Sequence, residues 1–262
     1  MTKAALRPDP VYTLTSVNVV LPGRDGPCPV LAGVALDIRP GEIVGIVGRS
    51  GVGKTTLLRV LAGLLAVSDG VVRLHGKPLD GPPDGVVMVF QDYENALLPW
   101  RTVHRNVALG LERRVRRAER DRRVEQALAT VGLSGRGRDH PAALSGGMAQ
   151  RVQIARALVM EPAILLMDEP FGALDAITKA SLQDLLLQVQ QLTGATVVFV
   201  THDLDEAIYL GDRVVVLAGR PGVVSHVVPT ELPRPRDQLA SRALPRYLHL
   251  RALLGEALRD AG

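Results

Sequence analysis

Apolar residues fall into short continuous runs separated by longer stretches with helical periodicity. The clearest runs are "EIVGIVG" (42–48), "AILLMDE" (163–169) and "ATVVFVTH" (195–202). Strands that are apolar on both faces belong inside a parallel sheet covered by helices. The pattern therefore predicts an α/β fold.

Other parts of the chain follow different patterns. The first 40 residues, as in "TLTSVNVVL" (13–21), alternate more strictly and are broken by Gly and Pro, which predicts an antiparallel β subdomain. Helix-like stretches dominate about 92–160 and predict a helical insertion. We expect one domain over 11–229 and a proline-rich, basic C-terminal tail, 230–262, without a catalytic role.

The composition fits a globular protein with a full core. Hydrophobic residues make up 47% and charged residues 22% of the 262 positions. The apolar runs are far shorter than the roughly 18–20 residues that span a bilayer, so we expect this chain not to cross a membrane. The start resembles no secretory signal and Cys28 is the sole cysteine, which favours a reducing cytoplasm.

The net charge of +4 comes largely from "RRVRRAERDRR" (113–123). Such a run can contact nucleic acid or anionic lipid. Behind it, however, Val124, Ala127, Leu128 and Val131 recur at helical spacing. We therefore favour an amphipathic helix that ends near Gly132 and has the arginines on its wet face.

A glycine-rich segment, "GRSGVGKTT" (48–56), joins one buried strand to a helix. It matches the phosphate-binding pattern G-x-x-x-x-G-K-[ST] in the strand-to-helix context that the pattern requires. Backbone N–H groups and the helix amino end would face phosphate, Lys54 would reach the β and γ phosphates, and the Thr55 hydroxyl would bind Mg²⁺. The predicted nucleotide-binding residues here are Gly48, Arg49, Ser50, Gly51, Val52, Gly53, Lys54, Thr55 and Thr56.

Two adjacent carboxylates, Asp168 and Glu169, end the strand in "ILLMDEP" (164–170). Adjacent strand residues point to opposite faces, so we expect the two acids to have different tasks. Asp168 is predicted to hold Mg²⁺, and Glu169 to take a proton from an attacking water. Three further polar residues follow apolar segments, where an open α/β sheet has its ligand crevice: Gln91, Asp175 and His202.

A second glycine turn, "LSGGMAQR" (144–151), opens another helix. With it in place, the chain resembles the ATP-binding subunits of ABC transporters over about residues 13–228. The segments that carry the resemblance occur in the family's order: "GRSGVGKTT", "VFQD" (89–92), "LSGGMAQR", "ILLMDEP", "GALD" (172–175) and "VTHD" (200–203).

The resemblance implies roles for the remaining polar residues. Gln91 would be a Mg²⁺ ligand and water sensor, His202 a γ-phosphate contact and Asp175 a coupler between subunits. Residues Ser145, Gly146 and Gly147 would present helix N–H groups to ATP held by a second copy, giving a homodimer with two nucleotides at its interface. In one respect the chain departs from the family, because Leu21 stands where an aromatic residue usually stacks on adenine, and Tyr12 is not assigned to this role.

Three tags, "LLPW" (97–100), "GRPG" (219–222) and "ELPRPRD" (231–237), resemble the nitrate, sulfonate and taurine import group. That group implies a membrane permease, a solute-binding protein and a peripheral position on the cytoplasmic face of the membrane. "LLPW" either docks the permease or plugs the helical insertion. Alternatives are an importer for bicarbonate or a thiamine precursor, a soluble ABC ATPase acting on nucleic acid, and a GTPase or small-molecule kinase.

Overall fold

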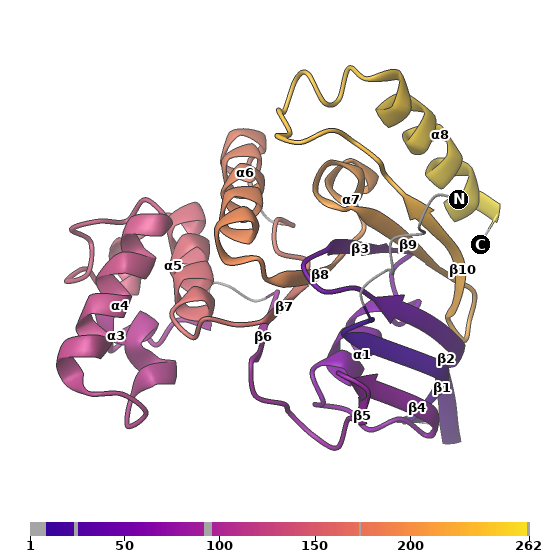
Figure 1. Ribbon diagram of the computed structural model, residues 1–262, viewed down its shortest axis with the longest axis horizontal. Helices are drawn as coiled ribbons and strands as arrows, with labels where there is room; N and C mark the ends of the chain where they lie inside the picture. The colour runs from indigo at the N-terminus through magenta and orange to yellow at the C-terminus, as the bar shows by residue number, and fades with distance from the viewer. Residues whose placement is uncertain (1–8, 24–25, 92–95, 173, 261–262) are drawn as a thin grey trace, which may run out of the picture. The chain divides into compact units, whose positions relative to one another are not determined.

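The computed structural model describes residues 9–23, 26–91, 96–172 and 174–260 (Figure 1). The chain folds into two compact units. The first unit consists of Met1–Pro83 and Thr196–Gly262, and the second unit is Asp84–Ala195. The boundaries expected at 11–229 and 230–262 stay a prediction.

The first unit contains an antiparallel sheet built from the early part of the chain. Its strands, in the order β2-β1-β4-β5, are β2 (Gly26–Ile38), β1 (Tyr12–Gly23), β4 (Asp69–Leu74) and β5 (Lys77–Pro78). β1 pairs antiparallel with both β2 and β4, and Tyr12 lies opposite Ile38. The antiparallel β layer expected from the alternating pattern is therefore confirmed.

A second sheet of the first unit has mainly parallel pairing. Its neighbouring strands are β10 (Val223–Pro229), β9 (Arg213–Ala218), β3 (Ile43–Val47) and β8 (Thr196–Thr201), in that order. β3 runs parallel to β8 and β9, and Val47 lies opposite Thr201 and Val216. All residues of β3 and β8 are buried, which explains why both are apolar on both faces.

Three helices belong to the first unit: α1 (Lys54–Leu61), α7 (Leu204–Leu210) and α8 (Pro245–Asp260). α7 packs on β3, β8 and β9, and α8 packs on α7 and β9 (Figure 1). At Gly45 a Cβ atom would lie 3.2 Å from the Cα atom of Ala207. A glycine is therefore needed in β3 for α7 to lie this close. The C-terminal tail packs on the unit through α8 rather than extending from it.

The second unit combines two parallel strands with helices. Its elements are β6 (Val86–Val89), α3 (Val103–Val107), a 3-10 helix (Ala108–Leu111), α4 (Arg117–Thr130), a 3-10 helix (Pro141–Ala143), α5 (Gly146–Leu158), β7 (Ile164–Asp168) and α6 (Ala176–Thr193). β6 and β7 are parallel, with Val89 opposite Met167. The predicted helical part is confirmed, although the start assigned to it, residues 92–95, lies outside the described residues.

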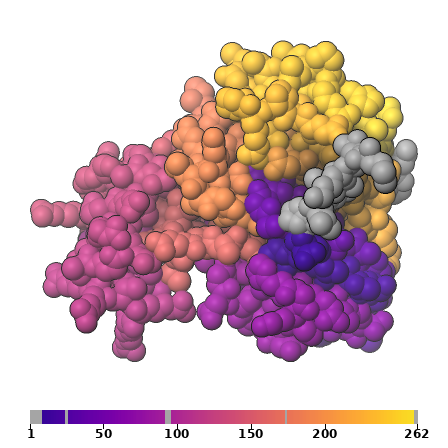
Figure 2. Space-filling view, in the orientation of Figure 1, coloured from indigo at the N-terminus to yellow at the C-terminus, as the bar shows by residue number. Residues whose placement is uncertain are grey.

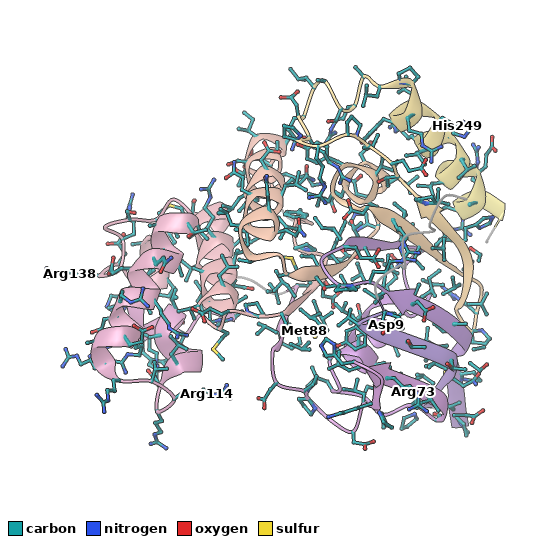
Figure 3. The ribbon with its side chains drawn as sticks, in the orientation of Figure 1. Asp9, Arg73, Met88, Arg114, Arg138 and His249 are labelled. Atoms are coloured by element: carbon teal, nitrogen blue, oxygen red, sulfur yellow. The ribbon has the colours of Figure 1, made fainter. Side chains whose placement is uncertain are left out.

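The basic run forms part of the amphipathic helix α4, as the periodicity predicts. Val124 and Leu128 are buried, whereas Arg122 and Arg123 pair with Glu119 at 2.8 and 2.6 Å. Arg114, just before the helix, is exposed and points away from the helices in Figure 3. Across the part of the chain that the structure describes, no helix is both long and apolar enough to cross a membrane.

Candidate nucleotide site

The glycine-rich loop connects β3 to α1 in the first unit. Gly51 and Gly53 have φ of 79° and 104°, a region that favours glycine. At Gly48 a Cβ atom would lie 2.5 Å from the carbonyl oxygen of Leu217, so only glycine fits. Residues 48–53 can therefore close into a tight loop, as the spacing of the glycines predicts.

Lys54 lies inside this loop at the amino end of α1. Its side chain is buried, and Nζ donates to the carbonyl oxygens of Gly48 at 2.7 Å and Arg49 at 3.2 Å. The capping residue of α1 is Gly53, which has no side chain to cover the first N–H groups of the helix. A cation and a helix amino end thus face the same small space, which fits a phosphate group.

The other residues predicted for the loop differ in exposure. Val52 is buried, Arg49 and Ser50 are exposed, and Thr55 and Thr56 are half-buried. Arg220, in the "GRPG" turn, donates to the carbonyl oxygen of Ser50 at 3.5 Å. This turn therefore borders the phosphate loop, a contact that the sequence does not indicate.

His202 lies at the same edge of the sheet as the phosphate loop. Because Val47 pairs with Thr201, the residues after β3 and after β8 leave the sheet side by side. His202 is exposed there. The first unit thus brings together two of the predicted elements, the phosphate loop and His202.

In the second unit, Gln91, Asp168 and Glu169 lie at the carboxyl ends of the parallel strands β6 and β7. Asp168 is the last residue of β7 and is buried, while Glu169 is half-buried with φ of 42°, which is uncommon for a non-glycine residue. Gln91 Nε2 donates to Glu169 Oε2 at 3.4 Å. The structure therefore brings Gln91 to Glu169, as expected for two residues at the carboxyl ends of neighbouring strands. Asp92, the last residue of "VFQD", lies outside the described residues.

The second glycine turn forms the start of α5. Ser145 caps this helix, and its Oγ accepts from the N–H of Met148 at 3.4 Å. Gly146 and Gly147 are the first two helical residues. A Cβ atom on Gly147 would lie 2.4 Å from Cγ2 of Thr178 in α6, so the glycine lets α5 approach α6.

Asp175 caps α6 beside this turn. Its Oδ1 accepts from the N–H groups of Ile177 and Thr178 at 3.1 and 3.0 Å. Hydrogen bonds from Thr178, first from its side chain and then from its backbone, lower the pKa of Asp175 below its ordinary value. Thr178 thus connects Asp175 with Gly147, two predicted site residues. Ala173, within "GALD", lies outside the described residues.

A hollow of about 360 Å³ borders the phosphate loop in the first unit, and one of about 490 Å³ borders the second glycine turn in the second unit. Ser145, Gly147 and Thr178 line the second hollow together with Arg151. Arg151 joins α5 to α6 by donating to the Ser181 Oγ at 2.7 Å. Sequence reasoning missed Thr178 and Ser181, because no local pattern shows that they lie against the turn.

The structure shows the positions of Tyr12, Leu21 and Trp100, the residues that bear on the predicted adenine and permease contacts. The Tyr12 side chain is buried, and its hydroxyl donates to the carbonyl oxygen of Leu61 at 2.7 Å, consistent with leaving it out of the adenine site. Leu21 is half-buried and lies opposite Cys28 in β2. Trp100 is 72% exposed, so it does not fill the interior of the helical part, whereas Leu97 of the same tag is buried.

A glycine-rich loop with a buried lysine between a buried strand and a helix is characteristic of phosphate-loop NTPases, and a strand that ends in a buried aspartate followed by a glutamate agrees with that class. Comparisons with known proteins give the family. Residues 31–172 match the family described as ABC transporter. The chain therefore belongs to the ABC transporter family and carries its ATPase domain.

Several curated relatives have names that describe transport. The chain is 48% identical over 225 residues to the aliphatic sulfonates import ATP-binding protein SsuB 1 of Xanthomonas axonopodis pv. citri, covering 85% of this chain and 88% of that protein. It is 42% identical over 247 residues to the bicarbonate transport ATP-binding protein CmpD of Synechococcus elongatus, covering 93% and 88%. Identity to the nitrate import ATP-binding protein NrtC of Synechococcus elongatus is 44% over 235 residues, 88% of this chain but only 35% of that protein.

Solved structures confirm the fold. A dimeric post-hydrolysis state of the ATP-binding cassette MJ0796, bound to ADP and Pi, has a TM-score of 0.73 and 33% identity, covering 83% of this chain and 98% of that chain. The structure of cbiO1 from Clostridium perfringens, part of the ABC transporter complex cbiONQ, has a TM-score of 0.77 and 30% identity, covering 96% and 99%. The α/β phosphate-loop fold expected from the sequence is therefore correct.

Proposed function

We propose that this chain hydrolyses ATP to drive a membrane importer for a small oxyanion. The observation that carries the proposal is identity of 42–48% to ATP-binding proteins whose names specify bicarbonate, nitrate and aliphatic sulfonates. These three solutes share a small, negatively charged oxygen-bearing group. An importer for a thiamine precursor is the alternative.

The residues of the phosphate loop suit the triphosphate of ATP. Lys54 supplies a positive charge inside the loop, and α1 supplies backbone N–H groups. Thr55, Gln91 and Asp168 offer hydroxyl, amide and carboxylate oxygens, the donor types that Mg²⁺ prefers. Bound Mg²⁺ would neutralise phosphate charge as the γ-phosphate leaves.

Glu169 is the general base in this proposal. The residue is half-buried, and its Oε2 accepts a hydrogen bond from Gln91, which orients the carboxylate that would take the proton from water. His202 would contact the γ-phosphate from the first unit, and Asp168 would hold the metal.

We propose further that two copies act together. Ser145, Gly146 and Gly147 present the amino end of α5 at an exposed turn, suited to the γ-phosphate of ATP bound by a second copy. Asp175, which caps α6 beside them, would couple the two ATP sites of the dimer. The dimeric state named for the MJ0796 cassette supports this arrangement.

The partner in the membrane is a permease, to which a solute-binding protein would deliver the anion. Trp100 is the residue most suited to dock this permease, because a large aromatic side chain exposed by 72% can anchor an interface. This arrangement puts the chain on the cytoplasmic face of the membrane as a peripheral subunit. The ion pairs that arginines of α4 make with Glu119 argue against nucleic acid as the main partner.

The test is purification of the full chain from membranes in mild detergent. We expect a multi-span membrane protein, identified by mass spectrometry, to co-purify and to stimulate ATP turnover in vesicles. Trp100→Ala should lose this partner, whereas Leu192→Ala, a matched change at a side chain exposed by 78% in the same unit, should keep it. ATP turnover stimulated by DNA instead of a membrane protein would contradict the proposal.

A further inference from the structure

Hydrogen bonds connect the turn that carries His202 to the first turn of α7. Thr201 Oγ1 donates to the buried carboxylate of Glu206, and the N–H of Asp203 donates to Thr201 Oγ1 at 3.0 Å. Asp203 Oδ1 in turn accepts from the N–H of Asp205 at 2.8 Å. The position of α7 therefore fixes the backbone of His202.

α7 has only seven residues, too few to be stable without tertiary contacts. One side of the helix rests on the sheet, where Ala207 lies against Gly45. The opposite side is covered by α8, and Figure 2 shows the tail (yellow) forming the outer surface of this part of the first unit. Contacts from the tail are therefore the second support of the helix.

α8 holds α7 at the end next to His202. Tyr247 Oη donates to Asp205 Oδ1 at 3.0 Å, and Arg251 pairs with the same carboxylate at 3.1 Å. The Tyr247 side chain is buried, and this burial raises the pKa of its phenol, which keeps the donor proton in place. A buried hydroxyl of this kind fixes the position of its acceptor.

Arg236, from the "ELPRPRD" tag, holds the other end of α7. Nη1 donates to the carbonyl oxygen of Tyr209 at 2.7 Å and Nη2 to that of Gly211 at 3.0 Å. A cation here complements the negative end of the helix dipole. The side chain is 1% exposed and also pairs with Asp212 at 3.1 Å. Burial lowers the pKa of Arg236 to about 10, so it stays charged at neutral pH.

Asp212 extends this arrangement to the strand that leads to the phosphate loop. Its Oδ1 accepts from Arg236 and from Arg234, while Oδ2 accepts from the N–H of Ile43 at 2.9 Å. Ile43 is the first residue of β3. The tail thus contacts both ends of α7 and, through Asp212, the start of β3.

We propose that the tail is a positioning element of the ATPase site, in which Arg236 and Tyr247 hold α7 and thereby set His202. This inference rests on the proposed contact of His202 with the γ-phosphate. It assigns a role to the tail after Pro229, for which the sequence predicts no catalytic part. It also explains why Arg236, the second arginine of "PRPRD", is buried against the end of α7.

The experiment compares ATP hydrolysis by the full chain and its Arg236→Gln and Tyr247→Phe variants at saturating protein concentration. A small displacement of a catalytic group costs up to about 100-fold in rate, and we expect kcat to fall about 10-fold while KM for ATP stays within about twofold. Arg236→Lys, which keeps the charge, should recover part of the loss. The matched control is Arg246→Gln. Within the described residues, Arg246 bonds to Pro229, Thr230 and Glu231 and makes no bond to α7, so this variant should leave kcat unchanged.

Each variant is also made in a His202→Gln background to separate positioning from loss of stability. If the tail acts through His202, Tyr247→Phe adds no further loss of kcat there. A further loss of the same size, or an unchanged kcat in both single variants, overturns the inference. Tyr247→Phe removes one hydroxyl, so it keeps the test valid if Arg236→Gln fails to fold. A His202→Gln variant with full activity would instead refute the proposed role of His202 itself.

Discussion

Gly147 provides a test of how the second glycine turn packs. The effect of Gly147→Ala on the free energy of unfolding should change sign when one neighbouring methyl group, that of Thr178, is removed. In an open helix, Gly→Ala stabilises by about 0.5–1 kcal/mol. Here the new Cβ would meet Thr178 Cγ2 at 2.4 Å, and the β-branched side chain of Thr178 has few other rotamers into which it can move. Overpacking of this kind costs about 1–3 kcal/mol, so Gly147→Ala should lower the free energy of unfolding by about 1–2 kcal/mol.

Thr178→Ser removes the opposing methyl and keeps the hydroxyl. The next atoms of that side chain lie 3.7 and 3.8 Å from the added Cβ, an ordinary contact distance. In the Thr178→Ser background, Gly147→Ala should therefore raise the free energy of unfolding, by about 0.5–1 kcal/mol. Urea unfolding of the four proteins followed by circular dichroism measures both signs. If Gly147→Ala alone is as stable as the unchanged chain, the packing argument is wrong.

Three further predictions concern other parts of the site. Glu169→Gln should slow ATP turnover by about 10²- to 10⁴-fold, or about 3–5 kcal/mol of barrier, with ATP binding retained; loss of binding measured by calorimetry would contradict a role as base. Trp100→Ala should change the free energy of unfolding by less than about 0.5 kcal/mol, since the side chain is 72% exposed, and a larger loss in urea titration would show that it packs inside. Because the pKa of Asp175 is lowered, its contribution to stability is complete above the ordinary value of 3.8 and is lost as pH falls through the lowered value. Urea midpoints measured from about pH 6 down to about pH 2 should therefore fall more steeply on acidification for the unchanged chain than for Asp175→Asn, and parallel curves would refute this.

Features set by neighbouring residues could be predicted from the sequence. The glycines of the phosphate loop need particular φ values, so their spacing predicts the loop. Continuous apolar runs predict β3 and β8 because both are buried on both faces. Similarly, the spacing of Val124 and Leu128 predicts the buried face of α4.

Contacts between distant residues could not be predicted in this way. Thr178 touches Gly147, and Arg236 reaches Tyr209, only because the fold brings separate helices and loops together. Nothing in the "PRPRD" tag shows that one of its arginines is 1% exposed. Burial of a charge depends on partners elsewhere in the chain, here Asp212 and the helix carbonyls. The tail's contacts with α7 were therefore missed.

The pairing of Val47 with Thr201 limits which changes in length these strands can tolerate. Side chains of a strand alternate between faces, so one inserted or deleted residue in β3 or β8 reverses every side chain beyond it. In β8, such a change would turn His202 away from the phosphate loop, although His202 itself would still be present in the sequence. Among related chains, we expect insertions to accumulate in surface loops, while the spacing from Glu42 to Gly48 and from Thr196 to His202 remains constant.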